Sequence, residues 1–507
     1  MIAILRRCLA IGTRIAAPAH GVDLGKGWHM DITTILSNVD SFLWGVPMIV
    51  LLLGSHLYFT IRTRCIQRRI PQAIKITFSK DPHSPGDISQ FGALCSALSS
   101  TIGTGNIVGV GTAILAGGPG AVLWMWLTGV FGIATKYAET FMAVKFRVKD
   151  HAGEMLGGAM YAWERGFKRA DGSTPAWAKV GAVAFALLAA IASFGIGCAT
   201  QSNSLVNVIV SNVPGAPTWS NWAIGIAVAF LVSLVIFGGV KWLARVCEKI
   251  VPFMAIAYAL CCVVILFMNG HYVGDALGLI VTSAFTPQAG LGGLAGAGMA
   301  KAIQFGCARG LFSNESGMGS APIVASAAST SNPARQAMVS MTGTFWDTVV
   351  ICLLTGLVIV STLCANPDAD ALIATGSISA GAQLTSLAFA QIPVIGTPVL
   401  VFGMILFAFT TIIGWSYYGN RCVAYLFGRH AVRPYQVVYV FVSILGAVGV
   451  GDLVWTFSDI ANALMVIPNI ICVLLLSGMI ARETKHYVWD GFIEEKDETP
   501  IPVHEEK

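Results

Sequence analysis

The chain has 507 residues, of which 55% are hydrophobic and 11% charged, and its mean hydropathy is +0.72. Soluble domains carry roughly 25% charged residues, so this composition excludes an ordinary soluble protein and indicates a chain built for lipid. The length leaves room for about ten or more spanning helices of roughly 20 residues. Neither the net charge of +5 nor the twelve scattered cysteines indicates a nucleic-acid or metal site, because no basic aromatic patch, CxxC pair or Cys/His cluster is present.

Residues 1–40 are expected to form an N-terminal extension whose status the sequence leaves open. The small residues of 16–19 are typical of a signal-peptide cleavage site, but Arg6, Arg7 and Arg14 leave the apolar stretch before them too short. A mobile extension and a true start at Met30 are the alternatives, so the presence of residues 1–29 in the mature protein stays undecided.

The segment 88–115 is long enough to cross a bilayer, yet its centre has the composition of a loop. Gly103 and Gly105 disfavour a helix interior, and the hydroxyl and amide side chains around them can bind freed backbone groups. A break at membrane depth is tolerated only where it faces protein or a wet cavity, and in transporters such breaks form the binding site. A nucleotide-binding loop is excluded because the spacing to Gly109 is wrong and no strand precedes it.

About eleven spans are predicted in a transmembrane domain of residues 41–485. Besides 88–115, they are 42–61, 121–144, 180–208, 222–240, 250–268, 295–328, 337–361, 396–424, 435–450 and 455–480. An acidic tail, 486–507, follows, and its acidic run is expected to be solvated and disordered.

Lys and Arg residues give the orientation of these spans. They occur in every loop expected on one side, which are 62–80, 145–179, 241–249, 421–433 and 482–485. The loops expected on the other side have none; these are 211–221, 269–294 and 361–394, of which 269–294 is expected as a loop or an interfacial segment. The positive-inside rule therefore predicts a cytoplasmic C-terminus and, with eleven spans, an external N-terminus. The external loop 361–394 is expected to cover the site.

The segment 301–320 is the second stretch that does not fit a simple helix, because glycines and polar residues interrupt it at mid-depth. Counted from 88–115 as helix one, it is helix six, with five spans in each half. Two glycine-interrupted segments at matching positions indicate an inverted-repeat transporter. The half-helix ends at such breaks suit a carboxylate at the positive end and a cation at the negative end, which fits an amino-acid zwitterion and a co-transported ion.

Four motifs together resemble the alanine or glycine:cation symporter family, over about residues 42–485. They are Gly103–Asn106, the turn Gly117–Gly120 with the following Trp124-Met125-Trp126, Lys136–Glu139 and Ser313–Pro322. The resemblance implies the fold of the bacterial leucine transporter, an all-α polytopic five-plus-five inverted repeat with one extra N-terminal helix. It also implies sodium-coupled import of alanine, glycine or D-alanine by alternating access. A proton-coupled or uncoupled small amino-acid carrier is the alternative.

The resemblance also implies the site residues. The amides of Thr104 and Gly105 would hold the substrate carboxylate, with Asn106 nearby. The remaining residues expected around the substrate are Asn314, Gly317, Met318 and the pocket wall Trp415. A sodium site would take the carbonyls of Ser99 and Ile102 and the hydroxyls of Thr410 and Thr411, since a hard cation prefers several oxygen ligands. The coupling or gating candidates are Thr101, Glu139, Glu315 and Asp347.

Structural roles compete with several of these assignments. Glycine and hydroxyl residues often only pack membrane helices, and Trp415 fits a plain core position equally well. Glu139 and Glu315 are intramembrane acids, which are functional by default, but each is also compatible with a buried pair to Lys136 or Arg309. Asp347 fits an ion ligand or an interhelical hydrogen bond.

Two other classes of function compete with a symporter. A channel would repeat one short unit around an axis, whereas this chain has two separated broken segments in matching halves. A membrane enzyme would need a catalytic constellation, but the histidines lie mostly in loops or tails, and no HExxH or nucleophile elbow is present. We therefore expect no enzyme activity, no cofactor apart from the transported sodium, and no nucleic-acid partner. We expect a functional monomer in the cell membrane, the inner membrane if the source is Gram-negative.

Overall fold

The structure is a computed structural model that describes residues 32–504, apart from residues 80, 82–83, 214, 216, 218, 287–294, 367–380 and 450. Nearly all of these residues are helical. Within them, seven helices are long and apolar enough to cross a membrane, or eight if the bent pair within 90–117 counts as one span. The predicted all-α polytopic class is confirmed.

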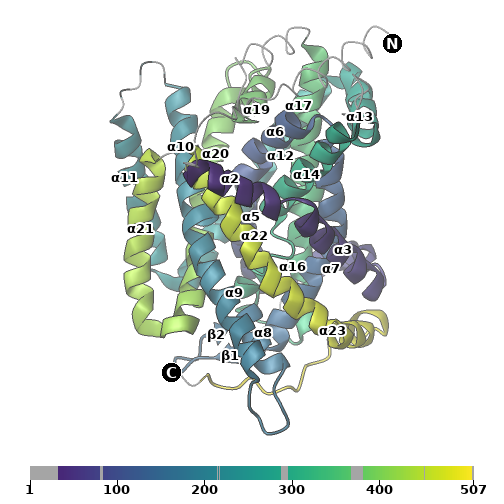
Figure 1. The fold of residues 1–507 in the computed structure, drawn as a ribbon, viewed down its shortest axis with the longest axis vertical. Coiled ribbons are helices and arrows are strands. Elements are labelled where there is room, and N and C mark those ends of the chain that lie inside the picture. The colour runs from purple at the N-terminus through teal and green to yellow at the C-terminus, as the bar shows by residue number, and fades with distance from the viewer. Residues whose placement is uncertain are drawn as a thin grey trace, which may run out of the picture.

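The core consists of two halves, which run from blue to teal and from teal to yellow in Figure 1. The first half contains α5 (Gln90–Thr101), η2 (Gly105–Gly109), α6 (Val110–Gly117), α7 (Ala121–Lys145), α9 (Ala176–Phe194), η3 (Gly195–Ala199), α10 (Thr200–Ser211), α11 (Ser220–Ile236) and α12 (Gly239–Met268). The second contains α14 (Ala295–Asn314), α15 (Ala321–Ala325), α16 (Pro333–Thr344), η4 (Phe345–Cys352), α17 (Leu353–Ala365), α20 (Gly396–Phe427), η5 (Arg429–Ala431), α21 (Val432–Val448) and α22 (Gly451–Leu475).

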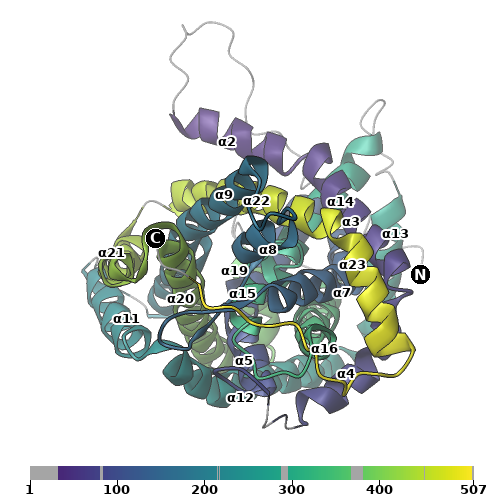
Figure 2. The same cartoon turned by 90° about the horizontal axis from the view of Figure 1, so that it is seen from below.

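The two broken helices lie inside the bundle. α7 packs against α14 and α16, while α5 packs against α12 and α20. α9 packs against α20 and α22, and α11 pairs with α21. In the view along the bundle, α15 lies near the centre, whereas α11 and α21 lie at the edge (Figure 2). The residues of both predicted breaks, 99–107 and 311–320, are buried inside the bundle.

A short helix lies at a matching place in each half. α8 (Ala159–Gly166) connects α7 to α9, after the hairpin of β1 (Val148–Lys149) and β2 (Met155–Leu156). α19 (Gly381–Phe389) lies between α17 and α20 and packs against α6. The two short helices lie at opposite ends of the bundle (Figure 1). This is the arrangement that an inverted repeat requires.

Further helices surround the core. They are α2 (Ile32–Leu43), α3 (Val46–Arg62), η1 (Ile66–Arg69), α4 (Ile70–Thr77), α13 (Gly270–Phe285), α23 (Ser477–Thr484) and η6 (Lys485–Trp489). α3 is the predicted extra helix; it packs against α7 and α14, and α2 packs against α22 (Figure 1). Pro47 stands in the first turn of α3, where the missing amide hydrogen costs nothing.

The structure corrects three sequence expectations. The segment 241–249 is not a loop but the start of α12, and 421–427 is the end of α20. The segment 269–294, expected as a loop or an interfacial segment, contains helix α13, while 287–294 lies outside the described residues. The acidic tail is not disordered as expected: up to residue 504 it packs across one end of the bundle (Figure 2). Residues 1–31 and the central part of the expected covering loop, 367–380, lie outside the described residues.

Candidate binding site at the two helix breaks

The first break separates α5 from the π-helical turn η2. The backbone becomes extended at Ile102, with φ −74° and ψ 97°, and is helical again at Thr104. The two pieces, Gln90–Thr101 and Gly105–Gly117, meet at an angle of 50°. A Cβ atom at Gly105 would lie 3.2 Å from Cα of Ser313, so glycine lets α14 approach closely. The predicted break is present.

Asn106 ties the first break to the second half of the chain. Its Oδ1 accepts from the amide of Gly103 at 2.9 Å, which satisfies a donor that the break sets free. Its Nδ2 donates to Asp347 Oδ1 at 2.7 Å, on the π-helical turn η4. π-helical turns inside longer helices occur frequently at functional sites.

Asp347 is fully buried and is surrounded by hydrogen-bond donors. Besides Asn106, Ser313 Oγ donates to its Oδ2 at 2.9 Å and Thr348 Oγ1 at 2.6 Å. Among the ion pairs of the described residues, none includes Asp347. The arrangement brings four oxygen-bearing side chains from η2, α14 and η4 to one point, where the carboxylate carries the only formal negative charge among them.

Thr411 and Thr410 on α20 face different neighbours. Thr411 Oγ1 lies 3.1 Å from the carbonyl of Ser99 at the first break and 2.9 Å from the carbonyl of Phe407 in its own helix. A Cβ atom at Gly103 would lie 2.7 Å from Thr411 Oγ1. Thr410 Oγ1 instead donates to the Leu406 carbonyl at 2.9 Å, within its own helix, and lies 4.0 Å from the sulfur of Met254. Of the two threonines predicted at the sodium site, the structure therefore places one hydroxyl on the first break.

The second break lies between α14 and α15. Glu315, Gly317 and Gly319 adopt positive φ angles of 53°, 93° and 77°. This conformation is easily reached by glycine but costs a residue such as Glu315 about 1 kcal/mol or more, so neighbouring groups must hold it. The composition of the segment predicted this break as well.

Glu139 and Lys136 on α7 hold the second break. The Oε2 atom of Glu139 accepts from the amides of Gly317 and Gly319, both at 3.1 Å, and from Asn469 Nδ2 at 3.0 Å. Lys136 Nζ lies 3.0 Å from the other carboxylate oxygen and donates to the Glu315 carbonyl at 2.9 Å. The Lys136–Glu139 pair thus satisfies a backbone that the sequence itself cannot keep helical.

Glu315 does not pair with Arg309, which was one alternative. Arg309 instead lies 3.0 Å from Asp459 on α22. The Glu315 carboxylate instead accepts a hydrogen bond from Ser320 Oγ at 2.6 Å. The predicted pocket wall Trp415 is fully buried on α20 and packs against Gly197 of η3. Among the remaining predicted residues, Thr101 donates to carbonyls of its own helix, and Met318 is fully buried.

The sequence analysis missed Gln201, which also reaches the first break. Gln201 is the second residue of α10, just after η3. Its Nε2 donates to the Ile196 carbonyl at 3.1 Å, and its Oε1 lies 3.6 Å from the Cβ position of Gly103. That Oε1 has no hydrogen-bond partner among the described residues, nor do Thr104 Oγ1 and Asn314 Nδ2. These atoms are therefore available to bind a polar ligand at the two breaks, although similar atoms occur elsewhere among the described residues. The polar run after Gly195-x-Gly197 was the signal that could have revealed Gln201.

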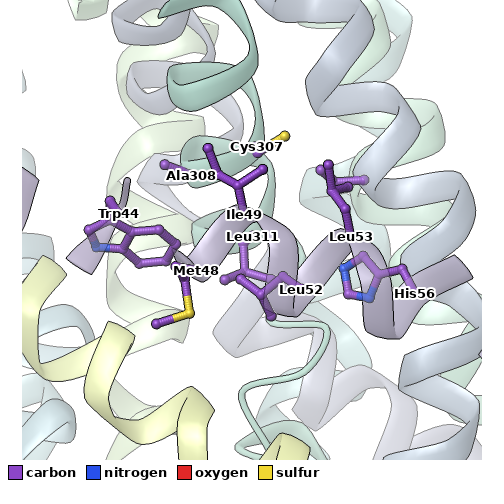
Figure 3. Close-up of a pocket in the computed structure, with 10 residues that line it drawn as sticks. Trp44, Met48, Ile49, Leu52, Leu53, His56, Cys307, Ala308 and Leu311 are labelled. Carbon is purple, nitrogen blue, oxygen red and sulfur yellow. The ribbon is translucent and has the colours of Figure 1, made fainter. Parts of the chain in front are cut away.

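A small apolar pocket lies beside the second break but is not part of the site. Figure 3 shows Met48, Leu52 and His56 of α3 facing Ala308 and Leu311 of α14. His56 Nδ1 lies 2.8 Å from Thr135 Oγ1 on α7. The extra helix α3 thereby supports α14 just before its break.

Comparisons with known proteins bear on the family and the fold of the chain. A sequence profile of the sodium:alanine symporter family matches residues 29–500. The sodium/alanine symporter AgcS of Methanococcus maripaludis is 45% identical over 462 residues, which cover 90% of this chain and 98% of AgcS. The probable sodium/glutamine symporter GlnT of Bacillus subtilis is 32% identical over 456 residues, which cover 89% and 92%. The crystal structure of MhsT in complex with L-phenylalanine matches 80% of this chain and 94% of MhsT, with a TM-score of 0.52 and 15% identity. This match confirms the fold of the bacterial leucine transporter.

Proposed function

Because the chain belongs to the sodium:alanine symporter family, we propose that it imports alanine or a similarly small neutral amino acid together with sodium. The observation that carries the proposal is the contact between the Thr411 hydroxyl and the Ser99 carbonyl, 3.1 Å apart, at the first break. It joins a freed backbone oxygen to a side-chain oxygen from another helix, which is how a site for a hard cation is built. Alternating access of the two breaks to either side would move both ligands.

The substrate carboxylate would bind the amides of Thr104 and Gly105. These amides begin a half-helix, so they lack partners within it and lie at its positive end. The substrate ammonium would lie near Asn106 and the backbone of Asn314, Gly317 and Met318 at the second break. Gln201 Oε1 and Thr104 Oγ1, both unpaired, are further groups for an amino acid to satisfy.

Sodium would take the carbonyls of Ser99 and Ile102 and the hydroxyl of Thr411. Thr410 joins this set only after its side chain rotates, because its hydroxyl is directed toward Leu406 and Met254. Size selection would come from Trp415, whose ring occupies the interior between α20 and η3.

A proton-coupled carrier is the second candidate, and the charges around the breaks favour keeping it. Lys136 is paired with Glu139, whereas the buried carboxylates of Glu315 and Asp347 take part in no ion pair among the described residues. Buried charges are rarely left uncompensated, so a transported cation or a proton would neutralise them during the cycle. Glu315 and Asp347 are therefore the coupling candidates.

Radiolabelled alanine uptake into proteoliposomes tests the proposal, with an inward sodium gradient imposed at fixed pH and, separately, an inward proton gradient without sodium. Accumulation above the external concentration with sodium alone supports the symporter. Accumulation with the proton gradient alone would favour the second candidate. Simple equilibration that ignores both gradients would contradict coupling altogether.

We also propose that the protein lies in the cell membrane with its C-terminus in the cytoplasm and works as a monomer. Arg429 of η5 lies 3.2 Å from Asp150 of the hairpin, so the basic residues of both segments lie at the end of the bundle where the C-terminal segment is docked. The positive-inside rule assigns that end to the cytoplasm.

A further inference from the structure

The C-terminal segment, residues 492–504, lies across the end of the bundle that carries α8 and the hairpin. Figure 2 shows it as a yellow trace that runs from beyond α23 past α16 and α15 towards α20. It adds to β1 in a parallel bridge: Lys149 donates its amide to the Pro502 carbonyl at 2.9 Å, and His504 donates to the Lys149 carbonyl at 2.7 Å. The His504 ring meets Tyr161 of α8 edge-on at 5.4 Å. These contacts dock the last residues of the segment on β1 and α8.

A second set of contacts joins the segment to the turn between α15 and α16. Asn332 Nδ2 donates to the carbonyls of Ile493 and Glu495, each at 2.8 Å, and the amide of Asp497 donates to the Ser331 carbonyl at 2.9 Å. The Oδ1 of the same Asn332 caps α16 by accepting from the Arg335 amide at 2.9 Å. One side chain therefore fixes both the start of α16 and the C-terminal segment.

Opposite charges reinforce this docking. Lys145, at the end of α7, lies 3.0 Å from Asp497, and Arg335 pairs with Glu494 and with Asp81. Burial alone would raise the pKa of Asp497. Hydrogen bonds from Thr499 and from the Lys145 ammonium outweigh burial, so the pKa is lowered. A carboxyl group with a lowered pKa stabilises docking at every pH above its ordinary value of 3.8, so this pair is fully formed at neutral pH.

The segment joins the hairpin and the end of α7 to the turn between α15 and α16, next to the elements that an opening at this end would separate. α5 and α15 are the half-helices between the two breaks and this end, and they meet below the breaks where Ile88 bridges Ala328. Arg147, just after α7, donates to the carbonyls of Ser326 at 3.2 Å and Ala328 at 2.8 Å. Because no continuous helix joins α5 and α15 to the rest of their spans, these half-helices can tilt without unfolding the bundle.

We propose that residues 492–504 form a latch that keeps this end of the transport path closed. The latch must leave Lys149, Ser331 and Asn332 before α5 and α15 can separate. The inference rests on the proposed alternating access, but the docking itself requires no particular substrate. Its release sets how often the path opens on this side.

Asn332→Asp tests the latch without removing the helix cap. Aspartate caps a helix as well as asparagine does, but it cannot donate to the carbonyls of Ile493 and Glu495. The matched variant is a chain that ends at Gly491. Amide hydrogen exchange of the detergent-purified protein is measured over 90–101 and 321–332 without added substrate.

We expect exchange to be roughly tenfold faster in both variants, which corresponds to a net loss of about 1.4 kcal/mol of docking. Combining the two changes should add nothing, because the substitution acts through the deleted segment. Unchanged exchange in both variants would overturn the latch. So would a full effect of Asn332→Asp in the truncated chain, because the substitution would then act on α16 alone.

A reversible cross-link gives the second test. Lys149 and Val503 face each other in the bridge, and Val503 is exposed, so a disulfide between Lys149→Cys and Val503→Cys is within reach in a Cys65→Ser background. Oxidation should abolish alanine uptake in proteoliposomes, and dithiothreitol should restore it, whereas each single-cysteine variant should be unaffected.

Two outcomes of the cross-link experiment would overturn the latch: undiminished uptake by the cross-linked protein, or two thiols that stay free under oxidation. If exchange changes as expected but no variant transports alanine, the proposed substrate fails and the latch stands.

Discussion

The two helix breaks are stabilised in different ways. At the first break, neutral side chains bind the freed backbone groups: Asn106 accepts from Gly103, and the Thr411 hydroxyl contacts the Ser99 carbonyl. At the second break, the amides of Gly317 and Gly319 both bind the carboxylate of Glu139, which is itself paired with Lys136.

This difference indicates different roles. A neutral hydrogen bond contributes roughly 1 kcal/mol, so the contacts of the first break can be exchanged for those of a ligand. Removing one partner from a buried ion pair costs about 3–5 kcal/mol, so the second break is fixed in its irregular shape. We conclude that the first break binds and releases ligands, while the second keeps its shape and holds its backbone carbonyls in fixed positions.

The largest effect is expected from filling the first break. Gly105→Leu places a side chain against Cα of Ser313, only 3.2 Å from the Cβ position, and across the expected carboxylate site. We expect alanine uptake to fall at least a hundredfold, because substrate binding is lost. The control is Gly54→Leu on α3, where a Cβ atom meets nothing within 4 Å. Normal uptake by the Gly105 variant would refute the proposed site.

The second break is tested by removing its counter-ion. Lys136→Met leaves the Glu139 carboxylate buried without a cation, and we expect a loss of about 3–5 kcal/mol in stability together with most of the uptake. Thermal unfolding in detergent measures the first effect. Adding Glu139→Gln should recover part of the stability, since the uncompensated charge is then gone. A Lys136→Met protein as stable as the parent would show that the second break needs no such support.

A smaller effect is expected from Thr411→Ala at the first break. The substitution removes one oxygen ligand beside the Ser99 carbonyl, so the sodium concentration for half-maximal uptake should rise about tenfold. The preference for alanine over glycine or serine should stay as it is. Thr411→Ser keeps the hydroxyl and serves as the control. Unchanged sodium activation in the alanine variant would remove Thr411 from the ion site.

The positions of both breaks could be predicted from the sequence because glycine composition is a local property. The partners of the breaks could not. Asn469 and Gln201 reach the breaks from helices far away in the chain, and nothing local distinguishes them from packing residues. The π-helical turns η3 and η4 were also missed, because one extra residue in a helical turn leaves the apolar pattern almost unchanged.

Two errors have a related cause. Basic residues at 241–249 indicated a loop, but Lys and Arg are good helix formers, so α12 extends through them. The acidic run of the tail indicated a solvated end. Its partners Lys145 and Arg335 lie more than 150 residues earlier, and only the folded chain brings them to Asp497 and Glu494.

The smallest effect is expected from Thr410→Ala, which sharpens the comparison within one helix. Its hydroxyl is directed toward the carbonyl of Leu406 and the sulfur of Met254, and among the described residues no hydrogen bond joins it to the first break. We expect the half-maximal sodium concentration to change no more than about twofold, against about tenfold for Thr411→Ala measured in the same uptake assay. Equal effects of the two substitutions would mean that Thr410 rotates onto the ion when sodium binds. The first break would then rearrange around its ligand, in contrast to the second, whose ion pair keeps it fixed.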